Sequence, residues 1–238
     1  MDKLASRFVT SQKTGHCMAV DLAACPDDEA ASARAVADLA ELCDRIAWDE
    51  DTRVVVLEFE GETNASLSVA VSGVKQPVIA AIKGNAVGPG LELALACDIR
   101  IAAEGACFGL PQVSLGRLPA GGGTQRLPRL IGQGKAMEMI LTGKLIDAGE
   151  AQRMGLIHRI VAAESLRSSA MDIAMEMASK SPLSLRFAKE AVYSGMDLTL
   201  DQGVKMEMDL YLLLFSTRDR VEGITAYKEK RKPKFEGI

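Results

Sequence analysis

Two short runs of apolar, largely β-branched residues constrain the fold more than any other feature of the sequence. They occupy residues 53–59 (Arg-Val-Val-Val-Leu-Glu-Phe) and 77–82 (Pro-Val-Ile-Ala-Ala-Ile). Each run has the length of a strand and is almost continuously apolar, which is typical of strands that are buried on both faces of a sheet. Because helices must cover both faces of such a sheet, the sequence predicts an α/β architecture.

Strand and helix patterns alternate around these two runs. Residues 17–22 predict an early strand, and residues 30–48 predict a helix that is preceded by acidic residues at its N-terminal end. A second helix is expected to start near Gly90 and to cover residues 91–97, and residues 99–102 predict another strand. A β-α-β order places consecutive strands parallel to each other, so we expect a largely parallel sheet.

The last third of the chain is helical in pattern. Helices are expected at residues 136–141, 148–154, 165–178, 183–193 and 200–215. We therefore expect an α/β core over residues 1–180 and a C-terminal helical extension over residues 181–238 that is not independent of the core. The segment 210–215 (Leu-Tyr-Leu-Leu-Leu-Phe) is apolar nearly all round, so either the chain's own core or another subunit must cover it.

Composition excludes several classes of protein. A chain of 238 residues with 48% hydrophobic residues can bury a substantial core, and a net charge of −4 gives no sign of nucleic-acid binding. The five cysteines are odd in number and form no Cys-x-x-Cys pair, which disfavours a disulfide framework and a structural zinc site. No apolar run approaches the length of a membrane span, and the N-terminus lacks an apolar signal segment. We expect a cytoplasmic protein without a membrane anchor.

Common catalytic signatures are missing, but one glycine-rich segment is a candidate ligand site. The chain has only two histidines, His16 and His158, and neither belongs to a recognisable catalytic motif. The segment 84–92 (Gly-Asn-Ala-Val-Gly-Pro-Gly-Leu-Glu) lies between a predicted buried strand and a predicted helix. Glycines allow close approach of a ligand, and a helix N-terminus stabilises developing negative charge. A tight strand-to-helix turn, with Glu92 merely well placed in the first helical turn, explains the same residues.

Several motifs, in order along the chain, resemble those of one known family. They are residues 77–84 (Pro-Val-Ile-Ala-Ala-Ile-Lys-Gly), 88–98 (Gly-Pro-Gly-Leu-Glu-Leu-Ala-Leu-Ala-Cys-Asp), 108–116 (Phe-Gly-Leu-Pro-Gln-Val-Ser-Leu-Gly) and 119–127 (Pro-Ala-Gly-Gly-Gly-Thr-Gln-Arg-Leu). From about Arg53 to the C-terminus, the chain resembles the enoyl-CoA hydratase/isomerase (crotonase) family.

The resemblance implies a fold, an assembly and a class of substrate. The fold would be of the ClpP/crotonase-like type, with a mostly parallel sheet wrapped by helices and C-terminal helices that build homo-trimers or hexamers. The substrate would be an acyl thioester of CoA or of an acyl carrier protein. Two backbone N–H groups would hold its carbonyl oxygen while an enolate forms. Hydration, dehydration or isomerisation in fatty acid metabolism would follow, with the CoA thioester as substrate and no bound cofactor or metal.

The resemblance also assigns candidate site residues. Glu92 matches a glutamate that acts as a general base or positions water, and Gln112 would orient water or substrate. The expected substrate-binding residues are Gly88, Pro89, Gly90, Ala65, Ser66 and Gly116.

Three departures from the family pattern put ordinary catalysis in doubt. Gln112 stands where hydratases have a second glutamate, and an amide cannot exchange a proton with the substrate near neutral pH. Pro89 stands at an expected oxyanion position but has no N–H. The segment 61–76 is shorter than the loop and helix of the family, which supply the other oxyanion donor. Backbone N–H groups at Ala65 and Ser66 are the candidate substitutes for that donor. An active hydratase or lyase is therefore weighed against a catalytically degenerate binding or subunit protein, a thioester hydrolase and a carrier-protein-dependent biosynthetic enzyme.

The glycine loop at residues 119–124 admits two interpretations. It has the composition of a phosphate-binding loop, but a loop that leads into a helix capped by Gly123 or Thr124 is the simpler explanation.

Overall fold

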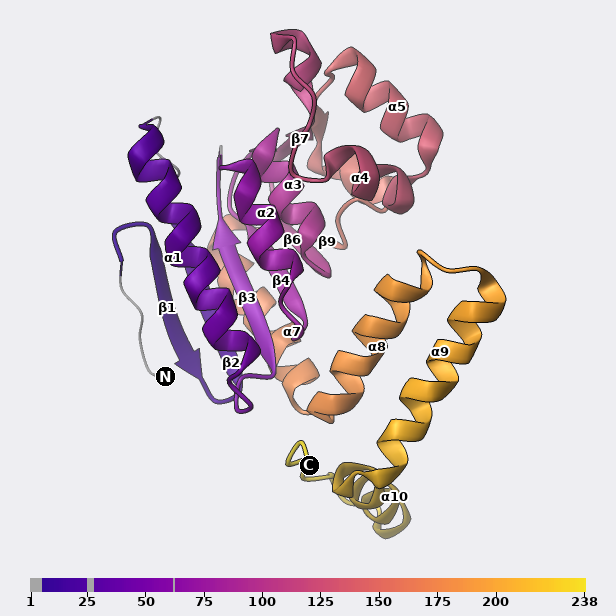
Figure 1. The fold of residues 1–238 in the computed structure, drawn as a ribbon. Helices are drawn as coiled ribbons and strands as arrows, with labels where there is room; N and C mark the ends of the chain where they lie inside the picture. The colour runs from indigo at the N-terminus through magenta and orange to yellow at the C-terminus, as the bar shows by residue number, and fades with distance from the viewer. Residues whose placement is uncertain (1–5, 25–27, 62) are drawn as a thin grey trace.

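A six-stranded sheet lies at the centre of the computed structural model, which describes residues 6–24, 28–61 and 63–238 (Figure 1). Its strand order is β1-β2-β3-β4-β6-β9, and a second sheet has the order β5-β7-β8. The strands are β1 Val9–Thr14, β2 Cys17–Leu22, β3 Val54–Phe59, β4 Val78–Ile82, β5 Ala86–Val87, β6 Ile99–Ala103, β7 Cys107–Gly109, β8 Ile146–Asp147 and β9 Arg159–Val161. Strands β2, β3, β4, β6 and β9 pair in parallel, and only the edge strand β1 is antiparallel in the large sheet, which confirms the predicted architecture.

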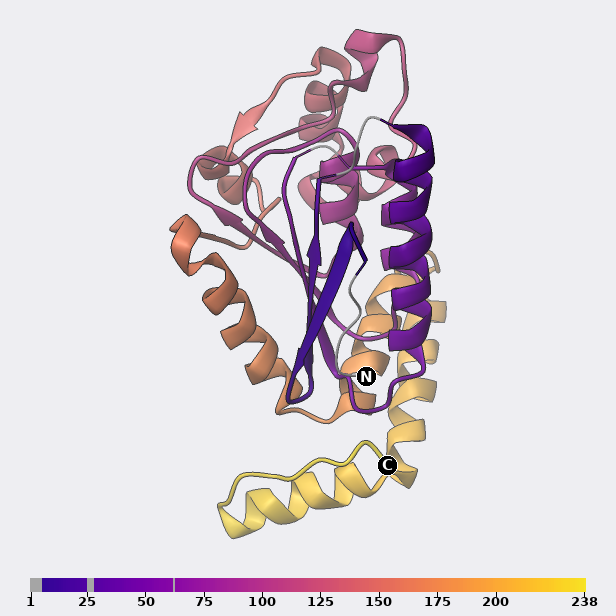
Figure 2. The same cartoon turned by 90° about the vertical axis from the view of Figure 1, so that its left-hand side faces the viewer.

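Helices cover both faces of this sheet. The α-helices are α1 Glu29–Ala47, α2 Ala65–Ser72, α3 Pro89–Ala96, α4 Gly123–Ile131, α5 Gln133–Thr142, α6 Ala148–Arg153, α7 Leu166–Ala178, α8 Pro182–Gly195, α9 Leu200–Leu213 and α10 Arg218–Glu229. The 3₁₀ helices are η1 Pro111–Leu115, η2 Ala163–Ser165 and η3 Leu214–Ser216. Figure 2 shows α1 and α7 on opposite sides of the sheet.

The central strands have apolar side chains on both faces because each face contacts a different layer of helices. Every residue of β3 and β4 is buried. Val55 and Leu57 belong to the apolar cluster that includes α1, α2 and α3, whereas Val54 and Val56 belong to the cluster that includes α7. This alternation follows from the two-residue period of a strand, and it explains why the two apolar runs show no polar face.

Several elements were not predicted from the sequence. Among them are the edge strand β1, the short strands β5, β7 and β8 of the second sheet, the helix α2 in the short segment 61–76, and the last helix α10. The N-cap of α2 is Asn64, whose side chain accepts a hydrogen bond from Ser66 N at 2.8 Å. The segment that replaces the family's loop therefore still contains a helix, and this helix packs beside α3.

The C-terminal helices α8, α9 and α10 extend away from the sheet (Figures 1 and 2). Leu210 is buried, but Tyr211, Leu212 and Leu213 are 53%, 54% and 57% exposed. The alternative that the chain's own core covers residues 210–215 is therefore wrong for most of this segment. A core boundary at residue 180 remains a prediction.

Within the described residues, no helix combines the length and the apolar character that a membrane span requires. Cys17, Cys43, Cys97 and Cys107 are free thiols, and Cys25 lies outside the described residues.

Candidate active site

Glu92 lies where the N-termini of two helices meet. It is in the first turn of α3 and its side chain is buried, with 1% of its surface exposed. Its Oε1 atom accepts hydrogen bonds from the backbone N–H groups of Gly121 at 2.6 Å and Gly123 at 2.9 Å. Gly123 is the first residue of α4, which has no side-chain cap of its own. A carboxylate at these positive helix ends is favourably placed, and Glu92 serves as the missing cap of α4.

The second oxygen of Glu92 is only weakly engaged. Its Oε2 atom is 3.4 Å from the side-chain Nε2 of Gln112, which is a long contact for a hydrogen bond. The Oε1 atom of Gln112 is buried and has no hydrogen-bond partner among the described residues. A carboxylate oxygen and an amide oxygen therefore both retain capacity to bind a small polar molecule.

The residues at the start of α3 have different roles. Gly88 has φ 57° and ψ −122°, a conformation that favours glycine, and its N–H donates to Gly109 O at 2.8 Å. Pro89 occupies the first helical position and supplies no donor. The first hydrogen bond of the helix runs from Glu92 N to Gly88 O, so the N–H groups of Gly90 and Leu91 precede it and have no intrahelical acceptor.

The loop after β3 runs against the N-terminus of α3. Gly61 N donates to Asn85 O at 2.9 Å. The carbonyl oxygen of Gly61 lies 2.6 Å from the position that a Cβ atom on Gly90 would take. Only glycine at residue 90 permits this close approach of the two backbones. The shortened segment therefore still borders the predicted substrate site.

Ala65 and Ser66 lie in the first turn of α2. The N–H of Ser66 is engaged by the side chain of Asn64, and Ser66 is exposed. The carbonyl of Ala65 accepts a hydrogen bond from the buried hydroxyl of Ser68, which also donates to Gly121 O at 2.8 Å. The geometry thus gives the Ser66 N–H a capping role, and substrate binding by Ala65 and Ser66 remains a prediction.

Gly116 has a conformational role that the resemblance did not indicate. It ends η1 with φ 66°, in the left-handed region, and its N–H donates to Val113 O. The residue is exposed. A substrate contact by Gly116 remains a prediction.

Gly121 and Gly123 hold Glu92 in place, a role that the sequence did not predict. The N-cap of α4 is Gly122, with φ 96° and no side-chain hydrogen bond, so the expected cap at Gly123 or Thr124 is wrong. A Cβ atom on Gly121 would lie 2.7 Å from Ser68 Oγ and 3.1 Å from Glu92 Cβ. Three consecutive glycines were the available signal, since glycine is required where backbone and side chains pack this tightly.

Both histidines have partners elsewhere in the fold. The ring Nδ1 of His16 lies 2.9 Å from Asp51 Oδ1, and the ring Nδ1 of His158 accepts a hydrogen bond from Arg100 N at 3.2 Å. Burial, together with the positive charge of Arg100, lowers the pKa of His158 below its ordinary value and favours a neutral ring.

Comparison with known proteins identifies relatives of this site and fold. The family model described as enoyl-CoA hydratase/isomerase matches residues 37–238. YngF of Bacillus subtilis is 43% identical over 199 residues, which cover 84% of this chain and 75% of that protein. The crotonyl-CoA hydratase of Syntrophomonas wolfei is 46% identical over 165 residues, which cover 69% of this chain but 64%, less than two thirds, of that protein. The crystal structure of an enoyl-CoA hydratase from Bacillus anthracis superimposes with a TM-score of 0.90 at 36% identity, covering 98% of this chain and 100% of that one.

Proposed function

The chain belongs to the enoyl-CoA hydratase/isomerase family, and from this premise we propose that it is an enzyme that hydrates or dehydrates acyl-CoA thioesters through an enolate. One observation carries the proposal. Glu92 is buried with one oxygen held by two backbone N–H groups, while its other oxygen has only a 3.4 Å contact with Gln112. A carboxylate fixed in this way can act on a water molecule without losing its position.

In the proposed hydration, Glu92 is the only acid and base. Its Oε2 atom accepts a proton from water while the water oxygen bonds to the β-carbon of a 2-enoyl thioester. The π electrons of the carbon–carbon double bond form a new double bond between the α-carbon and the carbonyl carbon, and the carbonyl π pair moves onto the thioester oxygen, which gives an enolate. Glu92 then returns its proton to the α-carbon, which balances the addition of one water molecule. Gln112 cannot supply that proton, so its amide orients the water through hydrogen bonds.

The enolate oxygen requires donors at the N-terminus of α3. Because Pro89 has no N–H, we assign this role to the N–H groups of Gly90 and Leu91. They lie at the positive end of the helix dipole, where negative charge is stabilised.

A catalytically degenerate binding or subunit protein is the second candidate. Two observations favour it: Pro89 removes one backbone donor, and Gln112 replaces the second carboxylate of a hydratase. Hydrolysis of a thioester, or a biosynthetic step on a carrier-protein thioester, would use the same carbonyl site with a different acyl group.

Assembly and location are further parts of the proposal. The exposed apolar side chains of residues 211–213 support a homo-trimer or hexamer in which another subunit covers α9. Free thiols at the four described cysteines fit a reducing cytoplasm.

The test is incubation of the purified protein with a panel of short and medium trans-2-enoyl-CoA esters, followed by mass spectrometry. A product heavier than the substrate by one water supports the proposal. Release of free CoA would indicate a hydrolase. CoA-ester binding without any product would indicate a binding protein.

A further inference from the structure

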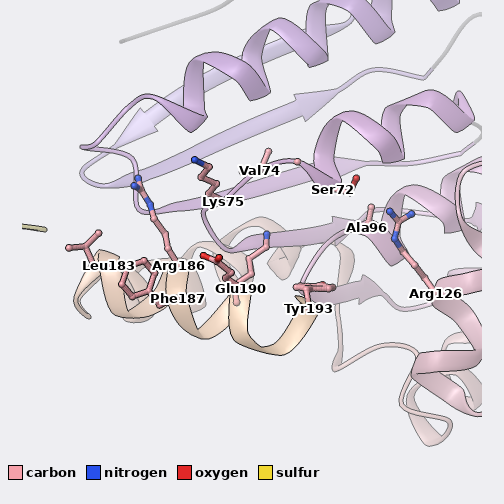
Figure 3. Close-up of a pocket in the computed structure, with 12 residues that line it drawn as sticks. Ser72, Val74, Lys75, Ala96, Arg126, Leu183, Arg186, Phe187, Glu190 and Tyr193 are labelled. Carbon is pink, nitrogen blue, oxygen red and sulfur yellow. The ribbon is translucent and has the colours of Figure 1, made fainter. Parts of the chain in front are cut away.

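A cavity of about 630 Å³ lies between α8 and the core, beside the C-terminal ends of α2 and α3 and next to α4 (Figure 3). This volume falls within the range of roughly 300–1,000 Å³ that is usual for small-molecule sites. Much of its wall is apolar, formed by Val74, Ala96, Leu183 and Phe187. Such a wall suits an aliphatic chain.

The charged residues of the same cavity are mostly basic. They are Lys75, Arg126, Arg186 and Lys189, with Glu190 as the single carboxylate. Lys189 is neutralised by an ion pair with Asp98, at 2.9 Å. The remaining three cations outnumber Glu190, so the cavity favours an anionic ligand over a neutral one.

One end of the cavity offers a specific anion-binding arrangement. Figure 3 shows Lys75 and Arg186 at this end and Arg126 at the other. The Nε atom of Arg186 is buried, but the side chain lines the cavity, and no hydrogen bond or ion pair of its guanidinium is found among the described residues. The two terminal N–H groups of a guanidinium are parallel and match the two oxygens of a carboxylate. A carboxylate in the cavity would therefore pair with a guanidinium that the described residues leave without a partner.

We propose that this cavity binds an aliphatic chain that ends in a carboxylate, with the chain along the apolar wall and the carboxylate at Lys75 and Arg186. Two sources can supply this chemistry. One is the acyl tail of a thioester whose other end is at Glu92, and this source rests on the proposed function. The other is a free carboxylic acid that binds independently of any thioester.

The cavity adjoins the Glu92 site through a shared wall. Ala96 follows Glu92 by one turn of α3, a rise of about 6 Å. Arg126 lines the cavity and donates to Gly121 O at 2.7 Å, and the N–H of the same Gly121 holds Glu92. Arg126 therefore links the wall of the cavity to the loop that holds Glu92.

Calorimetric titration of the full-length protein with octanoate, and separately with octanol, tests the proposal. Octanoate is expected to bind about 10–100-fold more tightly than octanol, because a charge-assisted hydrogen bond is lost with the alcohol. The double variant Lys75→Gln/Arg186→Gln is expected to lose that preference. The matched control Lys135→Gln/Lys228→Gln removes two lysines from outside the cavity and should keep it.

Equal binding of octanoate and octanol would overturn the proposal. It would also be overturned if neither ligand bound at millimolar concentration, as expected if a second copy of the chain fills the groove. Circular dichroism establishes that each variant is folded, so that a loss of binding refers to the cavity.

A second measurement separates the two sources. It compares kcat/KM for a trans-2-enoyl-CoA that carries a terminal carboxylate with that for the methyl-ended ester of equal length. A fall of about tenfold in this ratio in Lys75→Gln/Arg186→Gln assigns the cavity to the acyl tail. An unchanged ratio together with octanoate binding assigns it to a free acid. Octanoate binding by a protein that turns over no thioester would leave this inference intact and reject the proposed function.

Discussion

Two buried carboxylates in this molecule are held by backbone N–H groups, and they differ in how many of their oxygen atoms already accept hydrogen bonds. Asp219, in the first turn of α10, is 3% exposed and accepts hydrogen bonds from Glu236 N at 2.7 Å and Gly237 N at 3.1 Å. Both of its oxygens are engaged, because Glu236 N donates to Oδ1 and Gly237 N lies between the two oxygens, 3.2 Å from Oδ1 and 3.1 Å from Oδ2. Glu92 has one oxygen engaged by two N–H groups and the other nearly free.

The difference separates a structural carboxylate from a candidate catalytic one. Asp219 fixes the C-terminal tail on α10 through both of its oxygens. Glu92 is fixed equally well through Oε1, but Oε2 can still bind and deprotonate water. Glu92 therefore differs from Asp219 in keeping one oxygen available for water, which the proposed chemistry requires.

The largest expected effect is on turnover when Glu92 is changed to Gln. An amide oxygen can still accept the N–H groups of Gly121 and Gly123, but an amide cannot take a proton from water. We expect kcat for an enoyl-CoA to fall by about 10²–10⁴-fold, measured from the loss of enoyl absorbance. The same carboxylate-to-amide exchange at the other site, Asp219→Asn, is the control and should leave kcat within about threefold. Equal losses of kcat in the two variants would show that the free oxygen of Glu92 does not give it a role different from that of Asp219.

The next effect is on stability when Asp219 is changed to Ala. The N–H groups of Glu236 and Gly237 then lose their acceptor. We expect the free energy of unfolding to fall by about 2–4 kcal/mol, measured by urea denaturation, with a smaller loss for Asp219→Asn. A neutral effect of Asp219→Ala would show that the tail does not depend on this carboxylate.

Gly121→Ala tests the support of Glu92. The added Cβ atom would lie 2.7 Å from Ser68 Oγ and 2.9 Å from Ala65 O, so the loop must shift. We expect a loss of about 1–3 kcal/mol in stability together with a lower kcat, because the N–H that holds Glu92 moves. Gly134→Ala, where nothing lies within 4 Å of the new Cβ atom, is the matched control. Unchanged kcat in a destabilised Gly121→Ala variant would mean that turnover does not need the hydrogen bond from Gly121 N to Glu92.

The smallest expected effect is on turnover when Gln112 is changed to Glu, and it tests the role of Oε2 of Glu92. Gln112→Glu places a second carboxylate beside Oε2 of Glu92 and supplies a group that can protonate the α-carbon. We expect kcat for hydration to rise by about tenfold, with a pH–rate profile that gains a second ionisation. A fall in kcat with no new ionisation would indicate that Gln112 is already the better partner of Glu92.

The sequence predicted the central strands and the position of Glu92 in the fold because both depend on side-chain pattern. Continuous apolar runs indicated β3 and β4, and the motif around Glu92 placed this residue in the first turn of α3. The partners of Glu92 were not predicted, because they are backbone N–H groups, which every residue except proline has. The only sign of them in the sequence is that residues 121 and 123 are glycines.

Elements with weak or polar patterns were also missed. Helix α2 is short and depends on the Asn64 cap, and α10 depends on contacts of Asp219 with the returning tail. The cavity beside α8 could not be predicted either, because Lys75 and Arg186 are more than a hundred residues apart and meet only in the folded chain.

Chemical rescue of Glu92→Ala tests the central claim most directly. This variant frees the N–H groups of Gly121 and Gly123, which can then hold a small carboxylate in place of the side chain. With folding verified by circular dichroism, we expect enoyl-CoA hydration to be lost and to return in part, and saturably, on addition of formate but not of chloride at equal ionic strength. Full turnover in the variant without formate, or recovery with chloride as large as with formate, would contradict a catalytic carboxylate at Glu92.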